Sequence, residues 1–179
     1  MENKKNKHMF LWIYLVGVAG LVLLDQITKI IAEKHLYNQK PFVIIDGVFE
    51  FSYLRNEGAA WGLFSGQRVF FLIITVVLFI VVSYVVFRMP SIKKMIPLEM
   101  FCVLLGAGAI GNFIDRLLFG YVRDFVYFKL INFPVFNVAD CYVTVSVILF
   151  IILVFFIYRE SDMEFLKLSK ENTNQENES

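Results

Sequence analysis

The stretch VFFLIITVVLFIVVSYVVF, residues 69–87, carries no charged side chain over 19 residues. A helix that crosses the hydrocarbon core of a bilayer needs about 20 consecutive, mostly apolar residues. Residues 141–158 form another uncharged run, of 18 residues, that meets nearly the same requirement. We therefore predict that each of these two stretches forms a transmembrane helix.

Two shorter uncharged runs, 10–24 and 100–114, reach spanning length only if they carry polar residues at one end. The basic segment before the first run is also typical of a cleaved signal peptide. However, the run continues helically as DQITKIIAEK, residues 25–34, and no small-residue cleavage site follows it. The sequence thus predicts an α-helical integral membrane protein with four transmembrane helices.

Composition narrows the class of protein further. The chain is 58% hydrophobic, with a mean hydropathy of +0.65 and a net charge of +1. This balance argues against nucleic acid as a partner, because binding phosphates requires a clustered basic surface. Cys102 and Cys141 begin two spans predicted to be antiparallel, so we expect them at opposite membrane faces and without a disulfide.

Lysine and arginine residues predict the orientation. They gather before the first span and between the second and third: Lys4, Lys5, Lys7, Arg88, Lys93 and Lys94. Because short basic segments stay in the cytoplasm, we predict that both termini are cytoplasmic. This orientation places polar residues of three spans near the outer interface: Asp25, Lys29, Asn112, Asp115, Arg116 and Asp140. Ionisable groups inside a membrane are costly and suggest a functional site.

The connection after the first span is predicted to be external and to contain a small β-sheet, at about residues 40–60. PFVIIDGVFEFSYL, residues 41–54, has strand-forming residues on both sides of Asp46-Gly47, a strong hairpin signal. Trp61 suits an interfacial anchor. We expect one domain over residues 1–160, followed by a polar, disordered cytoplasmic tail over 161–179.

Two polar groups have the i, i+3, i+4 spacing of one helix face. Asp25, Thr28 and Lys29 form the first, which we interpret as an ion pair at the end of a span. Asn112, Asp115 and Arg116 form the second. We expect an Asp115–Arg116 pair and the Asn112 amide to tie helices together, with Gly106, Gly108 and Gly111 permitting close approach.

Asp124 and Asp140 differ in how well a structural role explains them. Asp140 occupies the N3 position of a predicted capping box with Asn137 as N-cap. Asp124 lies in an extended segment, where Arg123 should point the opposite way, so we find no comparable role for it. Two close, poorly solvated carboxylates share a proton. One can then activate water while the other protonates a carbonyl and a leaving nitrogen, without any metal or cofactor.

Five motifs together resemble the signal peptidase II family, the bacterial lipoprotein signal peptidases, over about residues 10–158. They are DQITK at 25–29, NEGAAWG at 56–62, GNFIDR at 111–116, GYVRDF at 120–125 and FNVAD at 136–140. The resemblance implies an intramembrane aspartic endopeptidase with four helices and an external β-cradle. It implies removal of signal peptides from diacylglyceryl-modified prolipoproteins, just before the lipidated cysteine, in the bacterial cytoplasmic membrane.

The resemblance also implies residue roles. Asp124 and Asp140 match the catalytic aspartates, which would face the outer leaflet. Residues that would bind or orient the substrate are Asn56, Asn112, Arg116 and Asn137. Asp25, Lys29 and Asp115 match important positions outside the dyad, for which we expect a structural role. Glu57 and Cys141 depart from the pattern expected of the family.

Two other functional classes compete with a peptidase. A small transporter also places acids and asparagines at helix ends, although the acids here cluster at one face and no inverted repeat is visible. A non-enzymatic scaffold would use the sheet to bind partners, and its acids would be structural. We expect a monomer whose partners are prolipoprotein signal peptides and membrane lipids.

Overall fold

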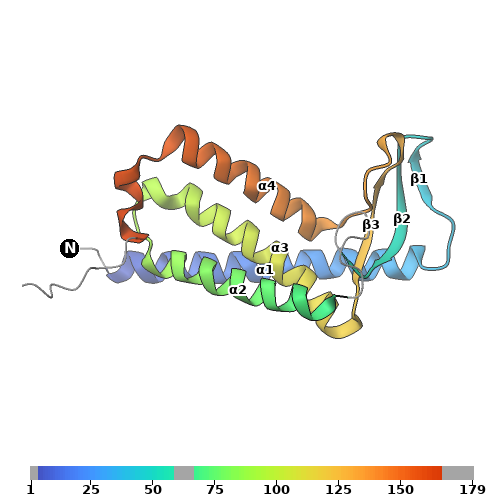
Figure 1. Ribbon diagram of the computed structural model, residues 1–179, viewed down its shortest axis with the longest axis horizontal. Helices are drawn as coiled ribbons and strands as arrows, with labels where there is room; N and C mark the ends of the chain where they lie inside the picture. Colours follow the sequence, from blue (N-terminus) through green and yellow to red (C-terminus); the bar gives the residue numbers. More distant parts are fainter. Residues whose placement is uncertain (1–3, 59–66, 167–179) are drawn as a thin grey trace, which may run out of the picture.

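The computed structural model describes residues 4–58 and 67–166. Its four main helices are α1 (Lys4–Leu36), α2 (Arg68–Arg88), α3 (Ile96–Phe119) and α4 (Val138–Ile152). Three strands, β1 (Phe42–Ile45), β2 (Phe49–Asn56) and β3 (Val122–Phe128), stand at one end of the helices (Figure 1). Short helical segments are η2 (Lys93–Met95), η3 (Lys129–Ile131), the π-helical η4 (Leu153–Ile157) and η5 (Glu160–Leu166).

The four predicted spans are confirmed. Helices over Lys7–Leu36, Arg68–Arg88, Lys93–Phe119 and Val138–Ile157 are long and apolar enough to cross a membrane. The first helix continues without a break through DQITKIIAEK, as predicted. Large apolar side chains on these helices face outward: Phe156, for example, is 82% exposed. Such exposure is the expected state of a surface whose solvent is lipid.

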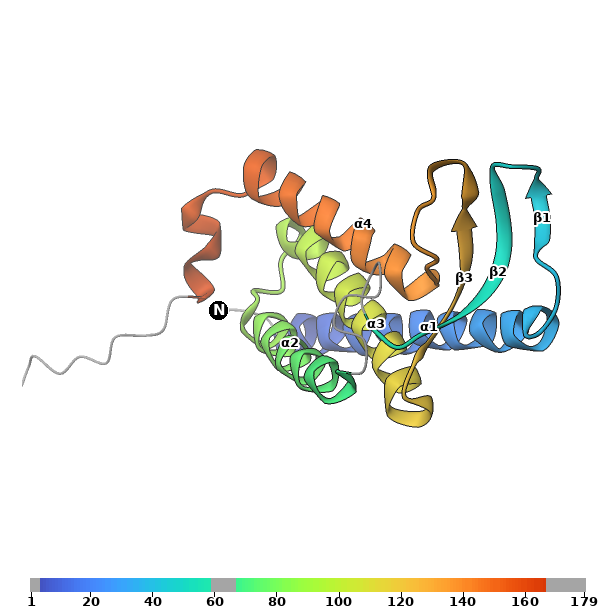
Figure 2. The ribbon, with the colours of Figure 1, turned by 45° about the vertical axis from the view of Figure 1, so that its right-hand side comes forward.

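Helix α3 lies at the centre of the bundle and packs against α1, α2 and α4 (Figure 2). Its interior face carries small or polar buried residues, including Gly106, Ala107 and Gly108. Small residues let helix backbones approach closely where lipid provides no hydrophobic drive for association. The bundle is therefore organised around α3, which also carries part of the polar cluster.

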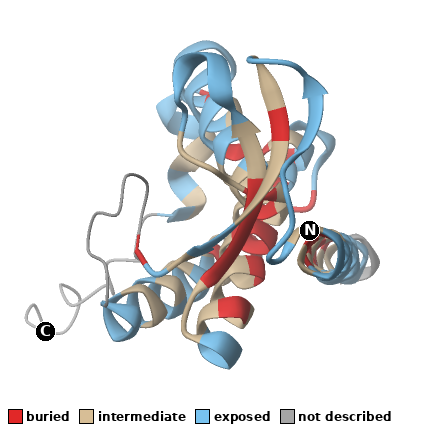
Figure 3. Cartoon of the chain, turned by 90° about the vertical axis from the view of Figure 1, so that its right-hand side faces the viewer, coloured by how far each residue is buried: buried red, intermediate tan, exposed pale blue. Residues whose placement is uncertain are grey.

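The predicted hairpin around Asp46-Gly47 is confirmed. β1 pairs antiparallel with β2 across a turn in which Gly47 has a φ of +69°. The segment that holds Asp124 forms β3 and pairs antiparallel with β2, giving the order β1-β2-β3. We did not predict this pairing from the sequence. β1 is exposed along its length, whereas residues 122–125 of β3 are buried (Figure 3).

The chain remains folded beyond residue 160, where we expected a disordered tail to begin. Residues 160–166 form η5, and its Met163 and Phe165 pack against the apolar cluster that includes Met95 and Leu153. Asp162 also pairs with Lys94, with 2.6 Å between nitrogen and oxygen. The predicted boundary at residue 160 was wrong because the segment that follows is polar on average but contains two apolar residues that pack against the bundle. The rest of the expected tail lies outside the described residues, as does Trp61.

Cys102 and Cys141 are both free, as predicted. Cys102 is buried in the bundle, and Cys141 is exposed next to Asp140.

Candidate active site

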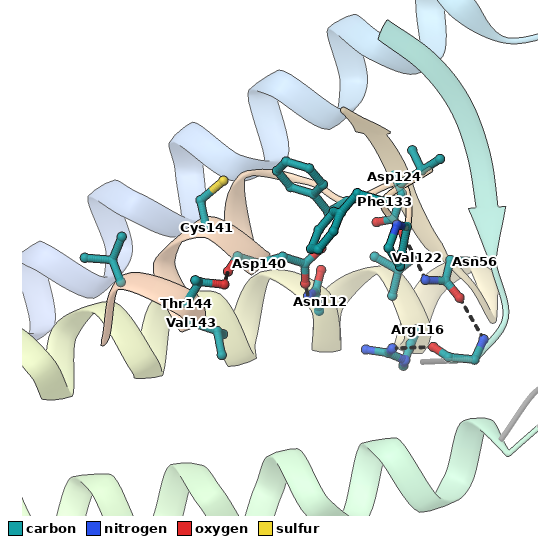
Figure 4. Close-up of a pocket in the computed structure, with 15 residues that line it drawn as sticks. Asn56, Asn112, Arg116, Val122, Asp124, Phe133, Asp140, Cys141, Val143 and Thr144 are labelled. Carbon is teal, nitrogen blue, oxygen red and sulfur yellow. Dashed lines mark hydrogen bonds between the residues drawn. The ribbon is translucent and has the colours of Figure 1, made fainter. Parts of the chain in front are cut away.

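Asp124 and Asp140 line one cavity at the junction of the sheet and the helices (Figure 4). Asp124 comes from β3 and is 1% exposed, while Asp140 comes from the first turn of α4. The cavity has a volume of about 600 Å³. Three other polar residues that the sequence predicted for this site also line the cavity: Asn56, Asn112 and Arg116. The structure therefore brings together groups that lie far apart in the sequence.

A short backbone bridge brings the two aspartates to the same cavity. Val126 of β3 pairs with Phe136 just before α4. The N–H of Val126 donates to the carbonyl of Phe136 at 2.8 Å, and the N–H of Phe136 donates to the carbonyl of Val126 at 3.0 Å. The intervening segment turns back on itself, so the start of α4 lies beside the Asp124 end of β3.

Asn137 contacts both carboxyl groups. The predicted capping box is confirmed, because the Asn137 side chain accepts from the Asp140 N–H and the Asp140 carboxylate accepts from the Asn137 N–H. The Asn137 Nδ2 donates to Asp124 Oδ1 at 2.6 Å and to Asn112 Oδ1 at 3.1 Å. One residue thus caps α4 and links the two aspartates.

Asn56 supplies the second amide donor to Asp124. Its Oδ1 accepts from the Gly58 N–H at 3.0 Å, so its Nδ2 is directed toward Asp124 Oδ2, at 2.8 Å. Burial, followed by the nearby charge of Asp140, raises the pKa of Asp124 from 3.8 to about 7. Hydrogen bonds from Asn56 and Asn137 act in the opposite direction, because they stabilise the carboxylate.

Asn112 connects Asp140 to a buried cation. Lys29 Nζ donates to Asn112 Oδ1 at 2.9 Å, and Asn112 Nδ2 donates to Asp140 Oδ1 at 2.8 Å. An ammonium group only donates, so this contact determines which end of the Asn112 amide faces Asp140. Lys29 is fully buried and also pairs with Asp25 at 2.9 Å, which confirms the predicted contact on α1.

Asp25 ties α1 to the start of α4. Its Oδ1 accepts from the Ala139 N–H at 2.9 Å, next to Asp140 in the chain. This N–H belongs to the first turn of α4, where it has no partner within the helix. An acidic side chain of one helix therefore completes the cap of another and helps place Asp140.

The expected Asp115–Arg116 pair is wrong. Asp115 is fully buried and pairs with Arg123, with distances of 2.8 Å to Nη2 and 3.1 Å to Nε. Lys29 Nζ lies 3.6 Å from the same carboxylate. Adjacent residues on a helix point in different directions, so Asp115 and Arg116 do not face each other. Arg116 instead donates to the Gly58 carbonyl at 3.1 Å and stacks over the Phe71 ring.

Arg123, Gln26 and Glu33 complete a partly buried polar network that the sequence did not reveal. Besides binding Asp115, Arg123 donates to Gln26 Oε1 at 2.9 Å and Glu33 Oε2 at 3.3 Å. Gln26 Nε2 in turn donates to the Gly111 carbonyl. The sequence did predict that Arg123 and Asp124 point to opposite faces of an extended segment. That pattern indicates that Arg123 has a partner on the other face, but it does not identify Asp115, Gln26 or Glu33 as that partner.

Gly111 permits the close approach of α1, α3 and α4. A Cβ atom at this position would lie 2.5 Å from Asp25 Oδ2 and 3.1 Å from the Ala139 Cβ. We expect Gly111→Ala to destabilise the protein by roughly 1–3 kcal/mol. It should also slow the reaction, because Asp25 holds the turn that carries Asp140. Thermal unfolding in detergent measures the first effect, and cleavage of the prolipoprotein substrate that the family resemblance implies measures the second.

Gly20 provides the control for this substitution. It lies on α1, and a Cβ added there would meet nothing within 4 Å. Gly20→Ala should leave both stability and turnover near the wild-type values, or raise stability slightly through helix propensity. Equal effects of the two substitutions would show that close packing at Gly111 is not required.

The arrangement has the groups needed to hydrolyse an amide bond. Asp124, with its raised pKa, can hold a proton, while Asp140 lies at the positive end of the α4 dipole, which favours a carboxylate. Among the described residues, no group of three or more metal-ligating side chains is close enough to hold a metal ion. The apolar part of the cavity wall includes Val122, Phe133 and Val143, so the part of a ligand that contacts this wall would be shielded from water.

Comparison with protein families identifies relatives of the chain. Residues 17–156 match the family model described as signal peptidase (SPase) II. A lipoprotein signal peptidase of Enterococcus faecalis is 38% identical over 162 residues, which cover 90% of this chain and 96% of that protein. One of Lactiplantibacillus plantarum is 39% identical over 142 residues, which cover 79% of this chain and 93% of that protein.

Two solved structures of bacterial membrane enzymes share the fold of this chain. A bacterial membrane enzyme determined by the in meso method at 2.3 Å resolution superposes with a TM-score of 0.72 at 34% identity. The match covers 90% of this chain and 95% of that one. A second, at 1.9 Å resolution, gives a TM-score of 0.71 at 35% identity, covering 83% and 96% of the two chains.

Proposed function

The chain belongs to the signal peptidase II family, and from this premise we propose that it cleaves diacylglyceryl-modified bacterial prolipoproteins as an aspartic endopeptidase. The cut falls on the N-terminal side of the lipidated cysteine. Family membership makes the chain a peptidase that removes signal peptides from prolipoproteins, so the transporter and scaffold hypotheses are set aside. The observation that carries the catalytic proposal is the cavity shared by Asp124 and Asp140.

In this mechanism the two carboxyl groups hold one proton between them. Asp140, as a carboxylate, removes a proton from a water molecule that attacks the scissile carbonyl. Asp124, protonated because of its raised pKa, donates to the carbonyl oxygen. When the C–N bond of the tetrahedral intermediate breaks, the proton that Asp140 took from water passes to the leaving nitrogen, and a hydroxyl proton of the intermediate returns to Asp124. The reaction consumes one peptide bond and one water molecule and yields a carboxyl group and an amine, and no cofactor takes part in it.

The neighbouring amides hold this pair in place. Asn137 and Asn56 direct N–H groups at Asp124, and Asn112, oriented by Lys29, directs one at Asp140. Arg116 lies in the same cavity and can bind a substrate carbonyl. We assign Asn56, Asn112, Arg116 and Asn137 to orientation, and Asp25, Lys29 and Asp115 to support of the site.

We propose that the site faces the outer leaflet of the cytoplasmic membrane. The sheet and the N-terminal end of α4, which carry the two aspartates, lie at one end of the bundle, and the connection between α2 and α3 lies at the other end (Figure 1). That connection carries Lys93 and Lys94, which favours a cytoplasmic location. In a variant whose own cysteines, Cys102 and Cys141, are replaced by serine, Asp46→Cys should react with an impermeant thiol reagent on intact cells. Reaction only after lysis would reverse the orientation.

The substrate proposal is tested with purified protein and two forms of one prolipoprotein. The diacylglyceryl-modified form should be cut just before the modified cysteine, as measured by gel shift and mass spectrometry. The unmodified form should be cut far more slowly, because it lacks the acyl chains that the apolar cavity wall accommodates. Equal cleavage of both forms would contradict the lipid requirement while leaving the peptidase activity intact.

Activity should fall as the pH rises through about 7. Asp124 has a raised pKa, so it is protonated below this value and loses its proton above it. The acid of the proposed mechanism then disappears, and kcat/KM should drop by about tenfold per pH unit well above 7. A pH profile of prolipoprotein cleavage in detergent micelles measures the effect.

Asn56→Ala tests the assignment of this pKa to Asp124. Asn56 donates a hydrogen bond that stabilises the carboxylate, so removing the donor should raise the pKa of Asp124 further. The alkaline limb of the profile should therefore move to higher pH, even if the maximum rate falls. A limb that stays in place or moves to lower pH would assign the titration to another group.

A further inference from the structure

A second cavity, of about 1040 Å³, lies on the opposite side of the sheet from the catalytic cavity. Asp124 lines the catalytic cavity and Phe125 lines this one. Successive side chains of a strand point to opposite faces, so the sheet separates the two spaces. The remaining wall comes from the C-terminal end of α1 and the segment that leads to β1, which lie together in Figure 1.

The ionisable residues that line this cavity are all basic. Lys34, His35 and Lys40 line it, and the described lining residues include no aspartate or glutamate. Within the described part of the chain, none of the three basic residues forms an ion pair. The acids on the adjoining elements are already engaged, because Glu33 binds Arg123 and Glu50 binds Lys129.

A helix dipole does not account for all of these cations. Lys34 and His35 lie in the last turn of α1, where a positive charge is favoured. Lys40 lies beyond the end of the helix and lines the same space. The three residues therefore form one basic rim, suited to an anionic group.

Apart from Thr28 and Gln39, the rest of the wall is apolar, and part of it is exposed at the protein surface. Ile31, Phe42, Phe51 and Phe125 line it, and Ile31 and Phe42 are 54% and 60% exposed. The candidate span of α1 ends at Leu36, so the basic rim lies at and just beyond the end of this apolar helix, where lipid headgroups are expected. The cavity thus matches a molecule with an anionic head and an apolar tail.

We propose that this cavity binds an anionic phospholipid from the leaflet that contacts the sheet. Its phosphate lies against Lys34 and Lys40, and an acyl chain follows Ile31 toward the aromatic side chains of the sheet. Because β3 forms part of the wall and also carries Asp124, the bound lipid braces the strand that presents this aspartate. The site is distinct from the substrate cavity and does not depend on the catalytic assignment.

Native mass spectrometry of the purified protein in detergent tests the proposal with phosphatidylglycerol and phosphatidylcholine of identical acyl chains. Phosphatidylglycerol should bind preferentially. Lys34→Gln and Lys40→Gln should each weaken its binding by roughly fivefold, since a basic residue near a lipid surface contributes on that scale. Binding of phosphatidylcholine should change little. Lys93→Gln, which alters an exposed lysine at the opposite end of the bundle, is the matched control.

Three outcomes would overturn the proposal. The first is equal binding of the two lipids, and the second is equal loss of binding in Lys34→Gln, Lys40→Gln and Lys93→Gln. The third is displacement of phosphatidylglycerol by millimolar inorganic phosphate, which would indicate an anion site without lipid recognition. Thermal unfolding of each variant without added lipid confirms that a loss of binding does not come from loss of the fold.

Discussion

Replacing either Asp124 or Asp140 by asparagine should abolish detectable cleavage of lipidated prolipoprotein. In the proposed mechanism one carboxyl group must ionise and the other must donate a proton, and an amide does neither. General acid–base groups contribute roughly 10² to 10⁴-fold each, so both Asp124→Asn and Asp140→Asn should lose at least that factor. Product formation with purified protein, followed by mass spectrometry, measures the loss.

The control for these two variants is Asp46→Asn. Asp46 is exposed at the tip of the β1–β2 turn, so the same chemical change there should leave cleavage unchanged. Both site variants must also bind a lipidated substrate peptide and unfold cooperatively on heating, because Asp124 and Asp140 each accept two hydrogen bonds in the fold. A folded variant that retains wild-type turnover would remove that aspartate from the dyad.

Replacing Arg123 by glutamine should have the largest effect on stability. Arg123 is 3% exposed and binds the fully buried Asp115 through two side-chain nitrogens and its backbone N–H. Its loss leaves the Asp115 carboxylate with Lys29, at 3.6 Å, as its remaining close cation. Breaking a buried ion pair costs about 3–5 kcal/mol, which would lower the thermal midpoint in detergent by roughly 10 °C.

Two further variants test the cause of this effect. Arg55 faces Arg123 across the β2–β3 pairing but is exposed, and its contacts are the rings of Tyr37 and Tyr121 rather than a buried carboxylate, so Arg55→Gln should cost only about 1 kcal/mol. Adding Asp115→Asn to Arg123→Gln removes the uncompensated charge, so the double variant should be more stable than the sum of the single effects predicts. Strict additivity would show that the two side chains do not act as a pair.

Local sequence patterns determined most of the fold. Uncharged runs such as 69–87 predicted the spans, because a segment that is long enough and apolar enough meets the requirement for crossing the hydrocarbon core of a bilayer. Asp46-Gly47 predicted the hairpin, and Asn137 with Asp140 predicted the capping box. Each of these features depends on residues a few positions apart, so a linear pattern contains the necessary information.

The motifs also predicted which residues form the site, yet tertiary structure decided how those residues pair. The sequence suggested that Asp115 binds its neighbour Arg116, whereas the folded chain pairs it with Arg123 of β3. It did not reveal that β3 joins the hairpin, or that the Val126–Phe136 bridge returns α4 to Asp124. A buried charge takes the partner that helix rotation and strand register bring within reach, and both arise only when distant segments pack together.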